Sequence, residues 1–341
     1  MEKQLKITVI IGAYHGEKYI GELLKSLFAQ TRVPDEILIG DDSDDDATFR
    51  AAEAVKDQYG GELRFLRNPQ KLGICANFEH LYREAKGDLV FFCDQDDVWL
   101  PEKIDKMSSY MAAHPECDLL FCDSHCTDGA LRKLGYTMFS RYAMTAPDVD
   151  AINSGHAFPL VVMKNIPFSS HDIALRKPLD YNVFPFDSKL GLYQDQHLGY
   201  LTSYMERMRC LPEPLTLYRR HDANASQLFS FDIAFDHYSV RDGDTHAAKL
   251  REFTDKMRRM LEILHKTPLC CEENRFNAEY LAEMIRFFDR RRELLKLPGP
   301  LRIFRLSPRD HIDYFRYCRG WRTLAHDLLC ARPVRTAGGG S

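Results

Sequence analysis

Long apolar runs are missing from this 341-residue sequence, and no stretch approaches the roughly eighteen uncharged residues that a membrane-spanning helix needs. No basic and apolar leader precedes the first β-branched segment, so we expect no signal peptide. Sequence repeats and low-complexity tracts are also missing. These absences argue against a membrane-spanning protein, and we expect a globular protein of the cytoplasm.

An excess of positive charge is missing as well. Lys and Arg number 46 against 50 Asp and Glu, a formal net charge of −4, which argues against general nucleic-acid binding. The ten cysteines show neither the dense, regular spacing of a small disulfide-bonded domain nor the spacing of zinc ligands. We therefore expect no nucleic-acid partner and reduced thiols. The length allows two domains, or one large domain with an extension.

Apolar segments typical of strands alternate with helical patterns over the first third of the chain. Such alternation indicates βαβ units, hence an α/β fold with a mostly parallel central sheet covered on both faces. The predicted strands span residues 6–12, 36–40, 63–66, 89–93 and 118–122, and the predicted helices span 17–30, 48–59, 74–85 and 103–113.

Carboxylates follow two of these strands directly. Asp94, Asp96 and Asp97 end an apolar strand, and Asp41 and Asp42 end another. Clustered anions repel one another unless a cation lies between them, and oxygen ligands suit Mg²⁺ or Mn²⁺. A second interpretation, an acidic loop that caps the next helix, stays open for the first cluster. Since ligands bind at the carboxyl ends of parallel strands, both clusters are expected to share one cleft.

The later parts of the chain differ in pattern. Residues 123–235 mix short apolar pieces with Pro, His and aromatic residues, which indicates an antiparallel addition and substrate loops. We predict a domain over 1–235, with a nucleotide-binding part over 1–122 and an acceptor part beyond it. A helical, basic region is predicted over 236–335, and the Gly-rich end, 336–341, is interpreted as a linker.

The C-terminal region is strongly basic. Residues 286–335 hold thirteen Lys and Arg but five Asp and Glu, with aromatic residues between them. Two interpretations stay open: a core-packed helix with a solvated basic face, or a segment that touches anionic lipid at the inner face of the cell membrane.

Four motifs in order, Val9–Tyr14, Ile39–Ser43, Asn68–Asn77 and Asp94–Trp99, resemble the successive motifs of family 2 glycosyltransferases. The match is nearest to the bacterial rhamnosyltransferase-like branch and covers about residues 5–225. The resemblance implies a GT-A type fold, a nucleoside diphosphate sugar as donor, Mg²⁺ or Mn²⁺ as cofactor, and inversion at the anomeric carbon. Its ordered set is more specific than any single motif.

The resemblance also assigns residues to the donor site. Asp96 matches the main metal carboxylate, and Asp94 matches the residue that holds ribose or metal. Tyr14, with Ala13 before it, matches the contact to base and ribose, and Asp42 the carboxylate that accepts a hydrogen bond from the base. For Tyr14 a core tyrosine is the plain alternative. Two further nucleotide-site residues are implied, Asn77 and a phosphate-binding arginine, Arg219 (with Arg220 as the alternative).

The acceptor side of the resemblance is less regular. Asp195 matches the general base that takes the proton of the acceptor hydroxyl. Glutamine and His197 stand beside it where a second acid and tryptophans are common, so His197 is a rival base or a sugar contact. His221 matches a metal or phosphate ligand, and His156 lies where donor sugar or acceptor is contacted. Gly12 replaces the usual proline before Tyr14, so the nucleotide loop is expected to differ in shape.

We therefore predict an inverting, metal-dependent glycosyltransferase. It would move a sugar, with rhamnose favoured, to a hydroxyl of a glycan or lipid-linked oligosaccharide in bacterial surface polysaccharide synthesis. Two alternatives are another metal-dependent nucleotide-phosphate enzyme and a non-catalytic sugar-nucleotide-binding module. A nucleotidyltransferase is disfavoured because the loop over residues 12–17 has no Lys or Arg.

Overall fold

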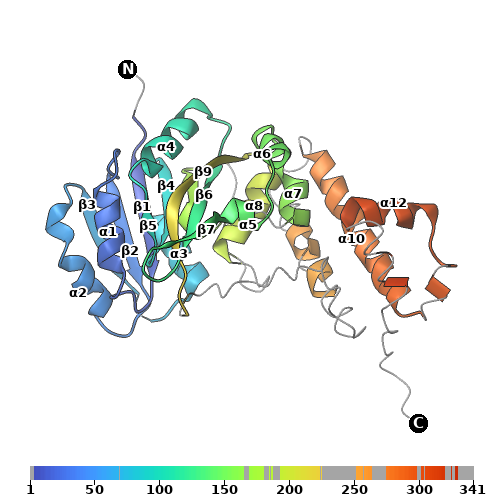
Figure 1. Cartoon of the computed structure of the whole chain (residues 1–341), viewed down its shortest axis with the longest axis horizontal. Coiled ribbons are helices and arrows are strands. Elements are labelled where there is room, and N and C mark those ends of the chain that lie inside the picture. Colours follow the sequence, from blue (N-terminus) through green and yellow to red (C-terminus); the bar gives the residue numbers. More distant parts are fainter. Residues whose placement is uncertain are drawn as a thin grey trace, which may run out of the picture. The chain divides into compact units, whose positions relative to one another are not determined.

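A computed structural model gives the fold as two compact units, residues 1–224 and 225–341, which are described one at a time (Figure 1). The structure describes residues 4–68, 70–164, 169–179, 184, 186, 193–222, 224, 251–255, 257–262, 274–297, 301–302, 304–318, 324 and 327–328. The predicted domain boundary at 235 and the interpreted linker over 336–341 lie outside these residues.

The first unit alternates strands and helices as predicted. Its strands are β1 (Ile7–Ala13), β2 (Glu36–Asp41), β3 (Glu62–Arg67), β4 (Leu89–Asp94), β5 (Val98–Trp99), β6 (Leu119–Thr127), β7 (Lys133–Thr137), β8 (Ile173–Arg176) and β9 (Met208–Arg219). Its helices are α1 (Ile20–Phe28), α2 (Ala47–Glu53), α3 (Ile74–Glu84), α4 (Lys103–Ala113), α5 (Met138–Arg141), α6 (Ala146–Asn153), α7 (Ala157–Lys164) and α8 (Gln194–Tyr204). The predicted helix over 48–59 ends earlier, at Glu53, and a 3₁₀ turn over Lys56–Gln58 follows it.

The described strands form one sheet in the order β3-β2-β1-β4-β8-β6-β9-β5, with β7 added beside β6. The first four strands are parallel, as predicted. Beyond them β8 runs antiparallel to β4 and β6, and β5 and β7 are antiparallel to their neighbours. The sheet as a whole is therefore mixed, and its antiparallel strands lie in the part after residue 123 or at the edge.

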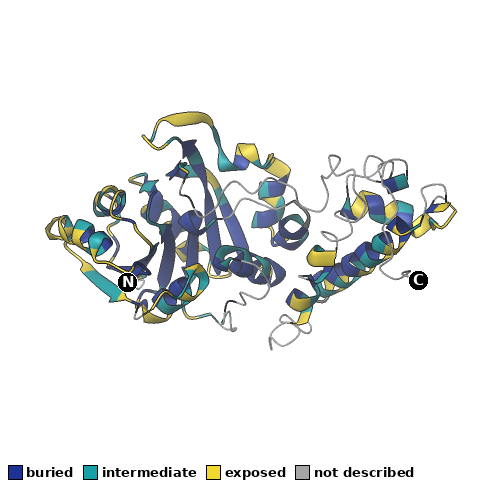
Figure 2. Cartoon of the chain, turned by 90° about the horizontal axis from the view of Figure 1, so that it is seen from below, coloured by how far each residue is buried: buried dark blue, intermediate teal, exposed yellow. Residues whose placement is uncertain are grey.

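Successive side chains of a strand point to opposite faces of the sheet. Because β1 and β4 are apolar along most of their length, helices cover both faces of the parallel half. Ile7, Val9 and Ile11 of β1 share one core with α1 and α4. On the other face Gly12 leaves room for the Phe78 ring of α3, which lies 2.9 Å from where a Cβ would stand. Figure 2 shows the resulting buried strands between partly exposed helices.

The second unit contains α10 (Arg275–Leu295) and α12 (Pro308–Tyr317), which pack through aromatic rings. Arg291 of α10 forms a buried ion pair with Asp327. Leu301, Phe304, Ile312 and Phe315 are exposed. The unit thus has a packed core that includes arginine, with apolar side chains also on its surface. Within the described part of the chain, no helix combines the length and apolarity needed to span a membrane.

Candidate functional site

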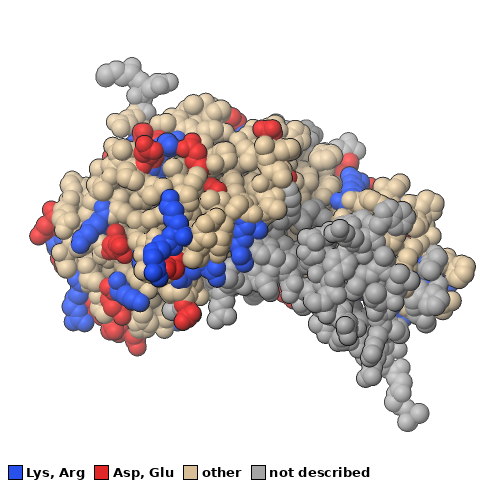
Figure 3. Space-filling model, viewed as in Figure 1, with Lys and Arg blue, Asp and Glu red and all other residues tan. Residues whose placement is uncertain are grey.

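The two acidic clusters lie at one edge of the sheet. In the parallel register Gly12 of β1 pairs with Asp94 of β4, and Ala13 pairs with Asp41 of β2. The carboxyl ends of three neighbouring strands therefore meet, as the sequence predicted. On the face that Figure 3 shows, Lys and Arg are interspersed with Asp and Glu over the first unit.

The cluster at the end of β2 shapes a loop. The buried Asp42 carboxylate accepts hydrogen bonds from the Asn68 amide at 2.7 Å, from Leu72 N–H at 3.1 Å and from Gly73 N–H at 2.7 Å. Both oxygens of Asp42 thus have donors within the fold. Asn68, Leu72 and Gly73 are held against β2 by a carboxylate whose partners among the described residues are neutral.

Asn77 supports the same arrangement from α3. Its amide donates to the Gly40 carbonyl at 2.8 Å and accepts from Asn68 at 3.0 Å. A Cβ at Gly40 would lie 2.4 Å from the Asn77 side-chain oxygen, so this approach requires glycine. Asn77 is fully engaged between strand and loop, and its role in the nucleotide site stays a prediction.

Gln95 is a site residue that the sequence reasoning passed over. Its side chain accepts from Tyr14 N–H at 2.8 Å and donates to the Tyr14 carbonyl at 2.9 Å, so that it clamps the loop after β1 to the loop after β4. The Tyr14 ring is half-exposed, and Lys71 Nζ lies 3.6 Å from the ring centroid. The position of Gln95 in the middle of the acidic motif was the signal that could have identified it.

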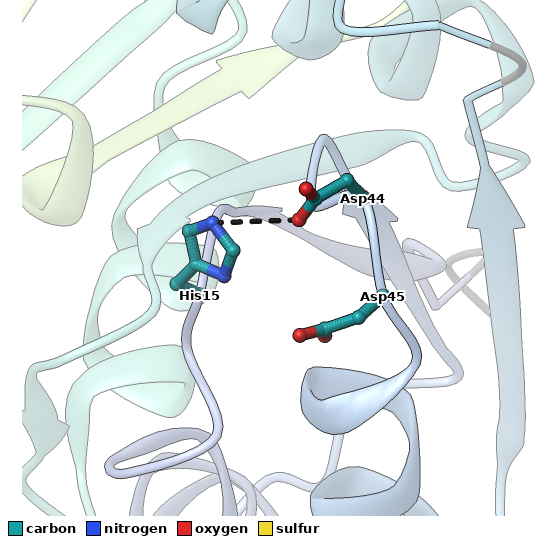
Figure 4. A group of neighbouring side chains, drawn as sticks. All are labelled: His15, Asp44 and Asp45. Atoms are coloured by element: carbon teal, nitrogen blue, oxygen red, sulfur yellow. Dashed lines mark ion pairs between the residues drawn. The ribbon is translucent and has the colours of Figure 1, made fainter.

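His15, Asp44 and Asp45 form a second group at this edge (Figure 4). His15 comes from the loop after β1 and the two acids from the loop after β2. Its ring nitrogen Nε2 lies 3.8 Å from Asp44, and all three residues are exposed. Exposed pairs of this length contribute little free energy, and we assign the group no metal.

Asp96 and His221 are brought together, as the resemblance implied. His221 Nε2 lies 2.8 Å from Asp96 Oδ2, and the Asn224 amide donates to the same oxygen at 3.1 Å. Burial raises the pKa of the Asp96 carboxyl, the nearby Asp94 raises it further, and His221 acts in the opposite direction. Asp96 is therefore a largely buried carboxylate whose Oδ2 meets an imidazole and an amide.

Arg219 is buried and engaged within the fold. Its guanidinium donates to the Asp96 carbonyl at 2.7 Å, to the Gly129 carbonyl at 2.8 Å and to Glu22 at 2.5 Å. Its backbone N–H donates to Asp97 at 2.8 Å. These contacts fix the end of β9 against the acidic motif. Phosphate binding by Arg219 stays a prediction.

His171 is the largest omission of the sequence reasoning. The ring is fully buried, and its Nδ1 lies 3.5 Å from oxygens of both Asp94 and Asp97. Its Nε2 lies 3.0 Å from Asp172, and the ring stacks on Tyr218 at 4.7 Å. Burial disfavours the charged imidazole, but the carboxylates of Asp172 and Asp97 raise its pKa well above the ordinary value.

The antiparallel direction of β8 explains this omission. Since Phe91 of β4 pairs with Ala174 of β8, the residues just before β8 lie at the carboxyl edge of β4. A strand's beginning therefore joins a site made of strand ends. The available signal was the Ser170-His171-Asp172 run before a short apolar segment; the sequence predicted an antiparallel addition over 123–235, but not that this segment pairs with β4.

Asp195 lies in the first turn of α8 and faces this edge. Burial raises the pKa of Asp195 to about 6. The negative charge of Asp94 adds to this shift, whereas the backbone N–H of Gln196 and of Ser170 and the charge of His171 lower the pKa. A carboxyl group with a pKa near neutrality is suited to proton transfer.

The resemblance implied two more histidines of the site, His197 and His156. His197 is buried in α8, with its ring edge-to-face on Phe186 at 5.5 Å. His156 is exposed in the link between α6 and α7, near Asn153, which hydrogen-bonds Cys210 at the start of β9. The acidic edge lies at the other end of that strand. Sugar contacts by both histidines stay predictions.

The residues at the edge fit a divalent cation. Asp94, Asp96 and His221 offer oxygen and imidazole donors, the kind that Mg²⁺ and Mn²⁺ accept. Asp94, Asp97 and His171 also have potential ligand atoms within 4.8 Å of one another. Buried Asp97 Oδ2 has no hydrogen-bond partner among the described residues, which is consistent with a site built around positive charge.

Relatives of this chain are found among bacterial proteins. An uncharacterised protein of Mycobacterium tuberculosis is 32% identical over 117 residues, 34% of each chain. An uncharacterised glycosyltransferase of Nostoc is 27% identical over 230 residues, 64% of this chain and 66% of that one. The chain thus spans about a third of the length of the mycobacterial relative.

Staphylococcus aureus TarS, a poly(ribitol-phosphate) β-N-acetylglucosaminyltransferase, is 29% identical over 153 residues, 44% of this chain and 25% of TarS. The crystal structure of TarS residues 1–349 with UDP superposes with a TM-score of 0.55 at 19% identity, over 95% of this chain and 88% of that chain, which shows a GT-A-like fold. The sequence model described as glycosyl transferase family 2 matches residues 8–179. Since this match spans half of the sequence, the chain belongs to glycosyl transferase family 2.

Proposed function

We propose that this glycosyltransferase moves a sugar from a nucleoside diphosphate sugar to a hydroxyl of a glycan or lipid-linked oligosaccharide, with inversion at the anomeric carbon. The observation that carries the proposal is the meeting of Asp94, the Asp96–His221 pair and Asp195 at one sheet edge. These residues come from β4, the end of β9 and α8, so only the folded chain assembles them.

Asp195 is the proposed general base. It takes the proton of the acceptor hydroxyl while that oxygen attacks the anomeric carbon and the bond to the diphosphate breaks. One displacement of this kind inverts the configuration, and the nucleoside diphosphate leaves with the electron pair. The raised pKa of Asp195 supports the role because the carboxylate can accept a proton near neutral pH.

Asp96 and His221 are the proposed ligands of Mg²⁺ or Mn²⁺, with Asp94 shared between the cation and the ribose. Bound there, the cation would neutralise the charge that develops on the leaving diphosphate. Asp96 is the central ligand candidate because the His221 imidazole, the second proposed ligand, lies 2.8 Å from its Oδ2.

Ala13 and Tyr14 form the proposed base and ribose contact. The exposed Tyr14 ring supports stacking, and Gln95 holds its backbone. Asp42 and Asn77 support the same site through the loop that they hold, and Arg219 through the acidic motif. One acceptor site, on Asp42 Oδ2, remains for a base N–H.

The sugar and its nucleotide are proposed from relatives. The names of TarS and of its complexes with UDP and UDP-GlcNAc favour a uridine diphosphate donor. The resemblance to the rhamnosyltransferase-like branch favours thymidine diphosphate-rhamnose. Both donors belong in the first experiment, and surface polysaccharide synthesis is the proposed context.

The proposed location is the cytoplasm, with peripheral contact to the inner face of the membrane through the second unit. Exposed Phe304, Ile312 and Phe315 support this contact. Arg309 and Arg316 both pair with Glu283, so the apolar side chains and not these charges would contribute most. Vesicle co-sedimentation of a Phe304→Ser and Phe315→Ser variant tests the contact, and binding equal to wild type would contradict it.

A ligand screen tests the central proposal. Thermal unfolding is measured with UDP, thymidine diphosphate, guanosine diphosphate, UDP-GlcNAc and thymidine diphosphate-rhamnose, each with and without Mn²⁺, because ligands that bind the folded state raise its stability. One nucleotide should raise the midpoint, and more so with Mn²⁺. Its sugar donor is then tested for transfer and anomeric configuration by NMR. Binding without transfer to any hydroxyl acceptor would favour the non-catalytic module.

A further inference from the structure

A buried imidazole lies beneath the acidic motif. His171 has no exposed surface, yet carboxylates approach both of its ring nitrogens. Asp172 lies 3.0 Å from Nε2, and Asp94 and Asp97 each lie 3.5 Å from Nδ1. The motif residues belong to or follow β4, whereas His171 and Asp172 precede β8, so the pairing exists only through the antiparallel contact of these strands.

The ring is held rigidly from behind. Asp172 accepts hydrogen bonds from the hydroxyls of Ser124 and Thr216, and Lys103 Nζ lies 3.6 Å from it. Lys103 also donates to the His171 carbonyl and to Thr216. A histidine fixed through Nε2 by a hydrogen-bonded carboxylate presents its other nitrogen in a defined direction.

The two carboxylates at Nδ1 differ in exposure. Asp97 is buried, with one oxygen on the Arg219 N–H and the other facing His171. Asp94 is 37% exposed at its side chain, with Oδ2 turned to His171. A buried carboxylate needs a neutralising partner, and an exposed one needs a partner if it is to keep one orientation. His171 serves both.

We propose that His171 is a positioning residue of the transfer site: it lies against both Asp97 and Asp94 and holds the Asp94 carboxylate turned toward the donor, so that Asp96 and His221 are left to the divalent cation. The inference rests on the proposed function for the meaning of the donor site. The placement of Nδ1 supports it, since this nitrogen lies 3.5 Å from both carboxylates while Nε2 lies 3.0 Å from Asp172. A direct metal ligand at Nδ1 is the competing role.

Two amide variants separate the two sides of the ring. His171→Asn places a donor near the position of Nδ1, whereas His171→Gln reaches the position of Nε2 and leaves Asp94 without a partner. With UDP and Mn²⁺ as probe, His171→Gln should weaken binding by about tenfold, and His171→Asn by about threefold or less. The KM for the donor should rise more than kcat falls. Equal losses in the two variants, both shown to be folded by thermal unfolding, would overturn the positioning role.

Mn²⁺ binding, followed by electron paramagnetic resonance, separates positioning from ligation. His171→Asn should keep the Mn²⁺ affinity within about threefold, whereas His221→Ala should lose tenfold or more. If His171→Asn loses as much as His221→Ala, the histidine is a metal ligand and the proposal fails.

A last measurement needs neither donor nor metal. In the free chain, Asp94→Asn should shift the ¹⁵N resonance of His171 Nδ1, and Asp44→Asn, at an exposed site, should leave it unchanged. An unmoved Nδ1 resonance in Asp94→Asn would overturn the positioning role. If Asp94→Asn shifts the Nδ1 resonance but the wild-type chain transfers no sugar, only the proposed function is contradicted.

Discussion

The carboxylates that end β2 and those that end β4 share a sheet edge but differ in their partners. Asp42 accepts hydrogen bonds from neutral donors of three nearby residues, Asn68, Leu72 and Gly73. Asp96 and Asp97 pair with His221 and His171, which come from much later in the chain. Neutral, fixed donors make the first group a part of the loop's architecture. Histidine partners from distant segments mark the second group as the one that we propose for chemistry.

The largest effect that this comparison predicts is at Asp96. Asp96→Ala removes the carboxylate that the proposed cation needs, so transfer should fall by about 10³-fold or more. The free energy of unfolding should change by only about 1 kcal/mol. Burial and the nearby Asp94 already disfavour the charged form of Asp96, so the folded state loses little when this carboxylate is removed. Single-turnover kinetics and Mn²⁺ titration measure both, with exposed Asp44→Ala as control. Unchanged turnover with a competent donor would contradict the metal role.

Asp195 should show the next largest effect. Asp195→Asn should lower kcat by about 10²-fold while UDP still binds, because only proton removal is lost. In wild type, kcat/KM should rise as the pH increases through about 6, where the carboxyl loses its proton, and the variant should lack this rise.

Stability gives an independent check on the same residue. Because folding raises the pKa of Asp195 from 3.8 to about 6, the folded state holds the proton more tightly and the contribution of this group to stability falls as the pH rises from about 4 to 6. Asp195→Asn should therefore be more stable than wild type at pH 8, and not at pH 4.

The rival base gives a separate test of the same assignment. If His197→Ala alone abolishes activity, the assignment of Asp195 as the general base is wrong.

Arg219 tests whether its contacts are structural. Arg219→Ala leaves the carbonyls of Asp96 and Gly129 without their donor, and the free energy of unfolding should fall by about 2–3 kcal/mol. Arg220→Ala, which loses a hydrogen bond to Tyr136, should cost about 1 kcal/mol. Urea unfolding measures both. A folded, equally stable Arg219→Ala with weakened UDP binding would instead favour the phosphate role.

The smallest effect is expected at the end of β2. Asp42→Asn places an amide against the Gly73 N–H and should cost about 1–2 kcal/mol of stability. The KM for the donor should rise modestly, and Mn²⁺ affinity should stay unchanged, because the carboxylate lies in the neutral group. A loss of Mn²⁺ affinity equal to that of Asp96→Ala would remove the distinction between the two strand ends.

Much of the parallel half could be predicted from the sequence. Apolar β-branched runs and amphipathic patterns located the strands and helices, and the helix over Lys103–Ala113 was predicted to the residue. The carboxyl ends of parallel strands share an edge, so the meeting of the two acidic groups followed from the pattern. The ordered motifs added the family, which the match over residues 8–179 confirms.

The second half could not be predicted in the same way. β8 has four residues, and nothing in Ile173–Arg176 states that it runs antiparallel between β4 and β6. That direction places His171 and Asp172 at the acidic edge. The partners of Arg219 could not be predicted either, because they lie far away in the sequence, as Glu22 does. A phosphate contact was therefore the natural prediction.

The sequence by itself determined the residue types at the strand ends and, through apolar periodicity, which strands lead to them. Tertiary structure alone decided which carboxylates are neutralised and by what. Pairing energies depend on burial and on distances of a few ångströms, and these come from contacts between segments far apart in the chain. The acidic motif of β4 was therefore readable in the sequence, and the histidine beneath it became visible only in the fold.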